Sequence, residues 1–453
     1  MDWDDLAEAN SQKLFAGWLH LLMRESPGLP LNVASRHRPG KQPVEASDYI
    51  TGSCNIACTV TFDDGSKVFV RFPILGRSRF RREKNNDELM VMQWVSRRTS
   101  IPVPKPLGTG LWSLGPYIVE SFIEGTLLST YLRDPSVRSP NLRPDVTTEE
   151  LEKAYRPMAK VVLELSKSEF PLIGALGYEA GAWKVIKRPL TLNMNELVRV
   201  GNLPPALFTQ KYFPNSSEYF QELASQHILH LKHQRNNAIE DEQDCRKKYI
   251  ARCLFRRITQ EIPTKPGPFR LWCDDLRPSN VLVNDTGSEF EVTGVIDWEF
   301  TYAAPVEFTH AAPWWLLFES PEAWEPDLKQ FLATRFEPRL QLFLKCLRAI
   351  EDAQLQQGTL KESQRLSGHM ERSMDDGSFW LCIAARKAFM FDDVYWQMID
   401  ERYFGKFTTL DDRVALLTQE ERDELDGFIR EKVKQAAEKT LDEHLTFDEV
   451  LEL

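Results

Sequence analysis

Three polar side chains in the second half of the chain could together carry out chemistry on phosphate. The stretch LWCDDLRPSNVLV, residues 271–283, holds Asp275 and, five residues later, Asn280. A further carboxylate, Asp297, follows in VTGVIDWEF. Phosphoryl transfer needs Mg²⁺ to neutralise the phosphate oxygens, and Mg²⁺ takes only a few hard oxygen ligands from protein. We therefore expect Asn280 and Asp297 to bind Mg²⁺, and Asp275 to orient and deprotonate an accepting hydroxyl.

The elements around these residues indicate how they could meet. The run VLV, a turn over residues 284–287 and the run VTGVI predict a β-hairpin directly after the loop. A loop followed by a hairpin can bring Asp275, Asn280 and Asp297 to one place although they are far apart in sequence. The proline of RPSN stiffens the loop, and Arg277 directs a fixed cation toward the phosphates.

The first half of the chain predicts a small antiparallel sheet with one helix. Asp64-Gly65 between two β-branched runs is a strong hairpin signal. A polar start leading into apolar residues predicts a helix over 82–99, and IPVPKPLGTG predicts a proline-rich connection. The further expected elements are a helix over 4–24, the hairpin strands 54–62 and 67–72, and a strand over 117–122. Beyond about residue 126 the pattern is mainly helical, with capping boxes at 147–150 and 418–421.

Two motifs in this order resemble a known family. Residues 275–280, DLRPSN, are similar to the D-L-K-P-x-N part of protein-kinase catalytic loops and to the H-G-D-x-x-x-x-N loop of aminoglycoside phosphotransferases. Residues 296–299, IDWE, are similar to the I-D-W-E of the latter. The chain thus resembles the aminoglycoside phosphotransferase/choline kinase branch of the protein-kinase-like fold, and in particular its fungal-type members that read WCDD at this point.

The resemblance implies a nucleotide site that uses ATP and Mg²⁺. Arg71 lies where the family has a strand lysine that binds the α- and β-phosphates, and Glu88 lies where a helix carboxylate pairs with that lysine. The remaining positions implied for the nucleotide are Gly52 and Ser53 in the covering loop, and Glu120, Phe122 and Ile123 at the hinge between the lobes. Three departures stand out. Arg71 replaces lysine, Cys273 replaces the histidine two positions before Asp275, and the covering loop has one glycine where protein kinases have several.

The resemblance also implies a fold. We expect an α+β, two-lobed, protein-kinase-like architecture with an antiparallel sheet in the small N-lobe and a mainly helical C-lobe. The expected parts are a helical extension and linker at 1–47, the N-lobe at 48–125, and the C-lobe at 126–453, with the catalytic loop at 271–283 and a metal-binding segment at 295–299.

The function that the motifs favour is an ATP-dependent phosphotransferase acting on a hydroxyl of a small molecule. A protein substrate is less expected, because no A-P-E-type segment follows Asp297. Arg71 and Cys273 keep an alternative open, namely an inactive pseudokinase that binds nucleotide or a partner. A kinase-like fold recruited to another reaction in secondary metabolism is a further alternative.

The net charge and the cysteine content limit the kinds of partner and site that we expect. The 453 residues carry a formal net charge of −11, which disfavours non-specific binding to nucleic acid or to an anionic membrane and could favour a cationic acceptor. The seven cysteines are odd in number and form no CxxC pair. The start, MDWDDLAEANSQKL, lacks the apolar core of a secretory signal, so we expect a cytoplasmic protein. No particular oligomeric state is predicted.

Several other side chains admit two interpretations. His227, His230 and His233 in HILHLKH could bind a metal, but their i, i+3, i+6 spacing diverges around a helix. Asp274 could be a second metal ligand or a loop cap. Glu299 could join the metal site, bind substrate or form a salt bridge. An aromatic group could form a cage for a cation, although core packing is favoured: Trp298, Tyr302, Trp314, Trp315 and Phe318.

Overall fold

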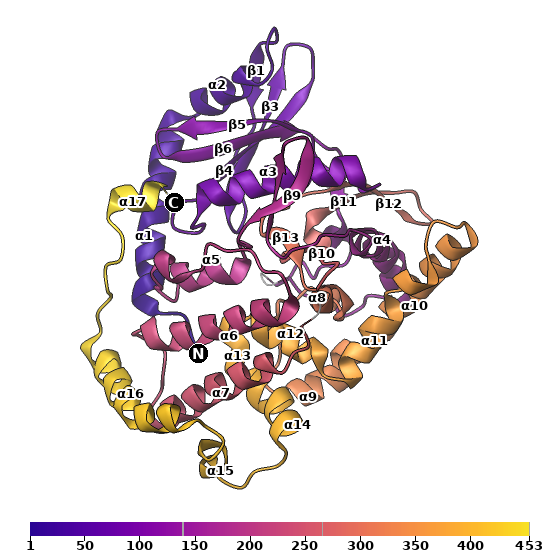
Figure 1. The fold of residues 1–453 in the computed structure, drawn as a ribbon. Helices are drawn as coiled ribbons and strands as arrows, with labels where there is room; N and C mark the ends of the chain where they lie inside the picture. The colour runs from indigo at the N-terminus through magenta and orange to yellow at the C-terminus, as the bar shows by residue number, and fades with distance from the viewer. Residues whose placement is uncertain (138–139, 265, 453) are drawn as a thin grey trace.

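An antiparallel sheet with strand order β1-β3-β4-β6-β5 forms the upper part of the molecule in Figure 1. The structure is a computed structural model and describes residues 1–137, 140–264 and 266–452. The strands of this sheet are β1 (Pro43–Ala46), β3 (Asn55–Phe62), β4 (Lys67–Pro73), β5 (Pro106–Trp112) and β6 (Gly115–Ser121), and the short β2 (Ile50–Thr51) pairs with β3.

The β3–β4 hairpin forms where the sequence predicts it. Its turn closes when the Gly65 amide donates to the Phe62 carbonyl at 3.0 Å, and Gly65 takes the left-handed φ of 79° that such a turn requires. By contrast, the expectation of a connection over 101–110 is wrong from Pro106 onward, because β5 begins there. β5 is an edge strand, where a proline costs no ladder hydrogen bond.

Helix α3 (Arg81–Arg98) crosses the sheet, and two N-terminal helices lie beside it. These are α1 (Asp5–Glu25) and α2 (Gly28–Arg36). The buried Asp4 carboxylate caps α1 by accepting from the amides of Leu6 and Ala7 at 3.1 Å each. Figure 1 shows α1 running from the sheet down to α5 (Leu192–Arg199).

The C-lobe is mainly helical. Capping boxes at Thr147 and Thr418 start α4 and α16, as the sequence predicts. Its longer helices are α4 (Thr148–Ser166), α6 (Ser216–His233), α7 (Glu242–Gln260), α10 (Glu337–Gln356), α11 (Ser367–Asp375), α12 (Ser378–Arg386) and α16 (Gln419–Glu438). Together with the antiparallel N-terminal sheet, they confirm the predicted α+β, two-lobed architecture.

Short strand pairs in the C-lobe position the polar motifs. β10 (Arg270–Cys273) pairs with β13 (Thr301–Ala304), β11 (Val281–Asp285) pairs with β12 (Phe290–Val295) and with β7 (Thr126–Leu127), and β8 (Ala175–Glu179) pairs with β9 (Ala182–Lys187). Cys273 and Thr301 are partners in the first pair. The loop that follows β10 and the segment that precedes β13 therefore leave from neighbouring strand ends.

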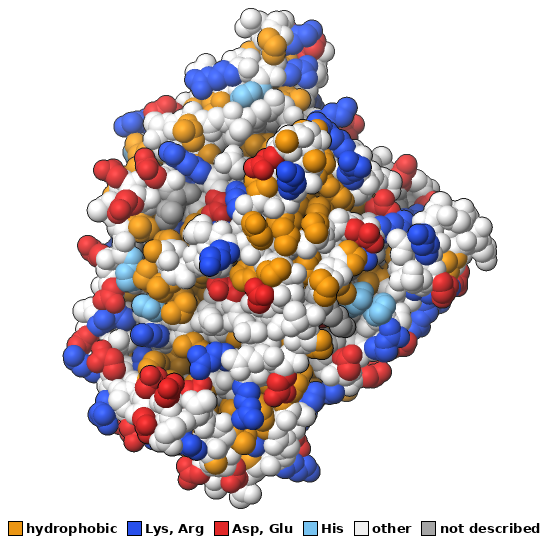
Figure 2. Space-filling view, viewed as in Figure 1, with side chains coloured by type: hydrophobic (Ala, Val, Ile, Leu, Met, Phe, Trp, Pro, Cys, Tyr) orange, Lys and Arg blue, Asp and Glu red, His pale blue; other side chains and the backbone are white. Residues whose placement is uncertain are grey.

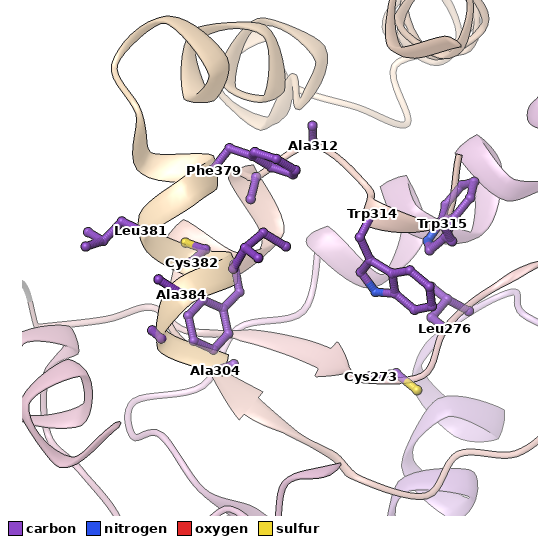
Figure 3. Packing of buried hydrophobic residues seen from close by; sticks show 14 of the residues in the cluster. Cys273, Leu276, Ala304, Ala312, Trp314, Trp315, Phe379, Leu381, Cys382 and Ala384 are labelled. Atoms are coloured by element: carbon purple, nitrogen blue, oxygen red, sulfur yellow. The ribbon is translucent and has the colours of Figure 1, made fainter. Parts of the chain in front are cut away.

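The aromatic residues that follow the IDWE motif are core residues. Trp298, Tyr302, Trp314, Trp315 and Phe318 are all buried. In Figure 3, Trp314 and Trp315 lie beside Leu276, while Cys273 sits on the strand leading into the loop. The packing interpretation is thus supported over a cation cage.

The histidines of HILHLKH also pack rather than converge. His227 stacks on Phe391 with ring centroids 4.3 Å apart, and His230 bonds to Gln234 at 2.7 Å. Burial lowers the pKa of both imidazoles, so they are neutral in the core.

The first residues of the chain contact the C-lobe, where the Asp4 amide donates to the Val200 carbonyl at 2.9 Å, whereas β1 and the C-terminal helix contact the N-lobe. β1 lies within the expected linker 1–47 and is already part of the sheet. Near the other end, Val450 and Leu451 of α17 (Phe447–Glu452) pack against the sheet's core, and Arg81 donates to the Leu451 carbonyl at 2.9 Å. Within the described residues, no helix is both long and apolar enough to cross a membrane. Over the face in Figure 2, acidic and basic side chains are interspersed.

Gly76 allows α1 to approach the N-lobe closely. Its φ is +89°, and a Cβ there would overlap the Ser11 carbonyl oxygen and lie 2.9 Å from the Phe15 amide nitrogen. We expect Gly76→Ala to lower the free energy of unfolding by about 2–4 kcal/mol, measured by urea titration. Gly40→Ala is the matched control, since Gly40 has φ +80° but open space around it, and should cost about 1 kcal/mol. Equal losses in the two variants would contradict the packing role of Gly76.

Candidate active site

The loop after β10 is held by its own asparagine. Asn280 Nδ2 donates to the Asp275 carbonyl at 2.8 Å and to its carboxylate at 3.3 Å. The Ile296 amide donates to the Asn280 carbonyl at 2.9 Å. Since Ile296 directly precedes Asp297, this bond ties the loop to the segment that carries the second carboxylate.

Asp275 is a buried carboxylate paired with Arg277. Arg277 Nε lies 3.1 Å from Asp275 Oδ1. Burial raises the pKa of Asp275, and Arg277 opposes that rise. A carboxylate with a raised pKa is better able to accept a proton near neutral pH.

Arg71 on β4 lies among three carboxylates from three different elements. Its guanidinium contacts Glu88 of α3 at 2.6 and 3.1 Å, Asp297 at 3.1 Å and Glu120 of β6 at 3.6 Å. Arg71, Glu88 and Glu120 are each at most 6% exposed. The structure thus brings together the strand cation, the helix carboxylate and the Asp297 carboxylate that the motifs singled out.

One guanidinium cannot balance three ionised carboxylates in a buried site. Burial, followed by the Glu299 carboxylate, raises the pKa of Asp297, and burial raises the pKa of Glu120 to about 7. If all three ionise, two negative charges remain uncompensated. This donor set and its excess charge fit a hard divalent cation such as Mg²⁺.

The backbone at Asp297 is strained. Its φ is 61°, in the left-handed region that residues with a side chain rarely occupy. Such strain persists where the surroundings fix it, and it often marks functional positions. Here it turns the Asp297 carboxylate toward Arg71.

A second buried ion pair joins the same two lobes. The ammonium of Lys84 on α3 pairs with Glu299 and also donates to Asn55 Oδ1 at 2.9 Å. Asn55 Nδ2 donates back to Glu299 at 3.0 Å. Burial acts to raise the pKa of Glu299, but the neighbouring Lys84 holds it below its ordinary value. Glu299 therefore forms a salt bridge, one of the three interpretations that the sequence left open.

Asn55 ends the short loop expected to cover the nucleotide. The Gly52 amide donates to the Asn55 carbonyl at 2.8 Å, which closes the loop into a tight turn. Ser53, at its tip, lines the same cavity as Asp275. The loop is thus held over the C-lobe through Asn55.

The side chains of the three expected hinge residues, Glu120, Phe122 and Ile123, point to different surroundings. The Phe122 side chain is 36% exposed and lies under the Lys67 ammonium at 5.6 Å, away from the Arg71 cluster. Ile123 packs onto Gly294 of β12, where a Cβ would lie 2.7 Å from Ile123 Cδ1. Glu120 points inward to Arg71, so it offers a side chain as well as the backbone groups that the resemblance implies.

The two residues before Asp275 have structural roles. Asp274 accepts from the amide of Leu192 at the start of α5 at 3.1 Å and from Trp272 Nε1 at 2.8 Å, so it acts as a cap. Burial raises the pKa of the Cys273 thiol, which disfavours a reactive thiolate. A cavity of about 40 Å³ lies between Cys273, Leu276 and Trp314.

A larger cavity of about 440 Å³ opens in front of Asp275. Its walls come from α1, the covering loop, the start of α5 and the residues after α12. Trp3, Leu192, Trp314 and Phe389 supply apolar surface. A cavity of this size, with the Asp275 carboxylate in its wall, can hold a small organic molecule.

Lys84 and Arg77 were not predicted as site residues, and Asn55 was expected only as the end of the covering loop. The spacing of Lys84 and Glu88, four residues apart on α3, could have indicated that both lie on one helix face. Arg77 gave no pattern that distinguishes it from other surface arginines. Within residues 1–137, 140–264 and 266–452, no three His, Cys, Asp or Glu side chains form a preformed metal cage.

A comparison with family models identifies the chain. The model described as the phosphotransferase enzyme family matches residues 58–343, more than half of the sequence. The chain belongs to this family. The matched range includes the Arg71 cluster and the Asp275 loop, so the resemblance based on those motifs is confirmed.

Individual relatives of this phosphotransferase family member are distant. Clavilactone A biosynthesis cluster protein Y of Ampulloclitocybe clavipes is 24% identical over 279 residues, or 58% of this chain and 62% of that protein. The match thus spans less than two thirds of that relative's length. Among solved structures, the GDP complex of wild-type aminoglycoside 2'-phosphotransferase-IIIa is 13% identical, with coverage of 91% and 100% and a TM-score of 0.40. Macrolide 2'-phosphotransferase type I is 14% identical, with coverage of 83% and 94% and a TM-score of 0.40.

The raised pKa of Glu120 predicts a pH effect on stability. Because the folded chain binds this proton more tightly than the unfolded chain, Glu120 stabilises the fold below its ordinary pKa of 4.5, and that contribution is lost as pH rises through about 7. As the pH is raised from about 5 to about 8, the unfolding free energy of wild type should therefore fall. Glu120→Gln cannot titrate at this position, so its unfolding free energy should fall by about 2 kcal/mol less.

Urea titrations at several pH values measure this difference. Glu124→Gln, at an exposed position nearby, serves as the control and should follow wild type. An identical pH dependence in Glu120→Gln and wild type would contradict the shared-cation geometry around Arg71.

Proposed function

We propose that this member of the phosphotransferase enzyme family transfers the γ-phosphoryl group of ATP to a hydroxyl of a small molecule. The observation that carries the proposal is the position of Asp275. This buried carboxylate lies at the end of a cavity of about 440 Å³ and close to the Arg71–Asp297 cluster. A base, a place for an acceptor and a charged group for phosphate are therefore adjacent.

Residues of the chain itself would take up the proton of the acceptor hydroxyl and hold the base in its orientation. Asp275 accepts the proton of the acceptor hydroxyl while the oxygen of that hydroxyl bonds to the γ-phosphorus. The bond between the γ-phosphorus and the β–γ bridging oxygen breaks, and ADP leaves. Arg277, 3.1 Å from Asp275, faces the same cavity and can balance negative charge there. Asn280 fixes the Asp275 backbone, so the base keeps its orientation.

Mg²⁺ is the metal that the donor set favours. Asn280 and Asp297 would hold it through a carboxamide oxygen and a carboxylate. When bound, Mg²⁺ neutralises charge on the phosphate oxygens. For Arg71, the proposed role is contact with the α- and β-phosphates, with Glu88 fixing its guanidinium.

A role in secondary metabolism is the biological setting we propose. It is supported by the similarity to clavilactone A biosynthesis cluster protein Y of Ampulloclitocybe clavipes. The polar site retains a base, a metal-type donor set and an open cavity, which favours catalysis over a purely nucleotide-binding role.

Replacing the proposed base tests the reaction. Asp275→Asn should lower acceptor-dependent ADP release by about 10²–10⁴-fold, because the amide cannot take the hydroxyl proton. The assay follows ATP and, separately, GTP turnover against a panel of phenols, sugars and alcohols. Asp48→Asn, at an exposed position, is the control. Equal turnover by Asp275→Asn and wild type would refute the assignment, and nucleotide binding without turnover on any acceptor would favour the pseudokinase.

Removing the proposed metal ligand tests the Mg²⁺ site. Asp297→Asn should lose most of the extra thermal stabilisation that Mg²⁺ adds to ADP binding, because a neutral amide binds the cation more weakly. The melting temperature is measured with ADP alone, with ADP and Mg²⁺, and after EDTA. Asp285→Asn is the control, since Asp285 pairs with Lys153 on the surface. A full Mg²⁺-dependent shift in Asp297→Asn would exclude this carboxylate as a ligand.

A further inference from the structure

Arg77 lines the same cavity as Asp275 and lies in the connection between β4 and α3. The ion pairs between described residues include none to Arg77. Burial, and then the neighbouring Arg199, lower the pKa of its guanidinium. The cavity therefore contains a cation that forms no ion pair with a carboxylate among residues 1–137, 140–264 and 266–452.

The structure fixes Arg77 from several directions. Its carbonyl accepts from Nδ2 of the fully buried Asn195 at 3.2 Å. Its guanidinium lies over the Phe15 ring of α1 at 4.1 Å, and Nη1 donates to the Gly52 carbonyl at 3.1 Å. An arginine held in this way loses little conformational entropy when it binds a ligand.

Most carboxylates around the cavity are already paired. Asp275 pairs with Arg277, Glu196 with Arg199 at 2.5 Å, Glu322 with Lys387 at 3.0 Å, Asp274 with Arg386 at 3.6 Å, and Glu299 with Lys84. Glu8 on α1 is the lining carboxylate without an ion pair among the described residues. A polycationic acceptor would therefore find little uncompensated negative charge on these walls.

We propose that this cavity binds an acceptor that carries a carboxylate or another anionic oxygen group, and that Arg77 recognises that group. This inference rests on the proposed phosphotransferase function. It differs from the expectation of a cationic acceptor that the overall charge of −11 suggested. The apolar surface of Trp3, Trp314 and Phe389 suits the body of such a molecule, with its hydroxyl directed to Asp275.

Two ligands could supply the anionic oxygens, because Arg77 also contacts the loop expected to cover the nucleotide. One is the acceptor and the other is the γ-phosphate of ATP. Both use the same charge-assisted hydrogen bonds to a guanidinium. The experiment must therefore measure acceptor binding and nucleotide binding separately.

Three matched probes test the acceptor. They share a phenol and differ at the other end: para-hydroxyphenylacetate carries a carboxylate, para-hydroxybenzyl alcohol is neutral, and tyramine carries an ammonium. Dissociation constants are measured by ligand-observed NMR on the full chain without nucleotide. Wild type should bind the carboxylate probe about tenfold more tightly than tyramine. Arg77→Gln should weaken the carboxylate probe about tenfold and leave the alcohol unchanged, and Arg77→Lys should restore part of the loss.

The controls separate a local effect from misfolding. Arg98→Gln removes an exposed arginine at the end of α3 and should bind all three probes as wild type does. Unchanged binding of the neutral probe by Arg77→Gln shows that its cavity is intact. If tyramine binds as tightly as the carboxylate, or if no probe binds in a carboxylate-dependent way, the proposal is overturned.

A nucleotide arm distinguishes the two sources of anionic oxygen. Binding of a non-hydrolysable ATP analogue with Mg²⁺ is compared between Arg77→Gln and wild type. Weaker analogue binding together with unchanged carboxylate binding would assign Arg77 to the γ-phosphate and overturn the acceptor role. Because the probe measurements need no turnover, a failure of the phosphotransferase proposal would not be mistaken for a failure of this one.

Discussion

The site depends on one guanidinium shared by three carboxylates, of which Glu88 and Glu120 are buried and Asp297 is partly exposed. Arg71 comes from a strand, Glu88 from a helix, Glu120 from the neighbouring strand and Asp297 from the other lobe. Removing the cation would leave uncompensated charge in a place that water hardly reaches, at a cost of several kcal/mol. The same shortage of positive charge is what supports the proposal of a metal and phosphate site beside Asp297. In that proposal, the stability of the free protein and the binding of its ligands have a common electrostatic origin.

Helix α3 extends this connection to the covering loop. Lys84 and Glu88 are one helical turn apart, and each contacts a carboxylate or guanidinium outside the helix. Through Asn55, the Lys84–Glu299 pair also reaches the loop that ends at β3. A shift of α3 would thus disturb both the Arg71 cluster and the covering loop. The helix, the loop and the IDWE segment are therefore expected to move together.

The sequence was most informative where local rules determine the structure. The Asp64-Gly65 turn, the capping boxes at Thr147 and Thr418, and the two polar motifs each depend on a few adjacent residues. It was less informative where the tertiary surroundings of a residue determine its structure. Pro106 is an example, because a proline fits in β5 only since this strand lies at the edge of the sheet. Lys84 and Arg77 belong to the same class, because only the tertiary fold shows that one meets Glu299 and the other faces the cavity.

The origin of the cavity walls has a consequence for how such a protein can diversify. The end of the cavity at Asp275 is built from the C-lobe loop and lies close to the Arg71 cluster. Glu8 and Gln12 come from α1, a separate helix packed alongside, and Trp3 directly precedes that helix. Substitutions on this face of α1 would reshape the cavity and leave the Asp275 loop and the Arg71 cluster unchanged. The range of molecules that fit the cavity could therefore change through a few positions of one helix, in evolution or in a designed library.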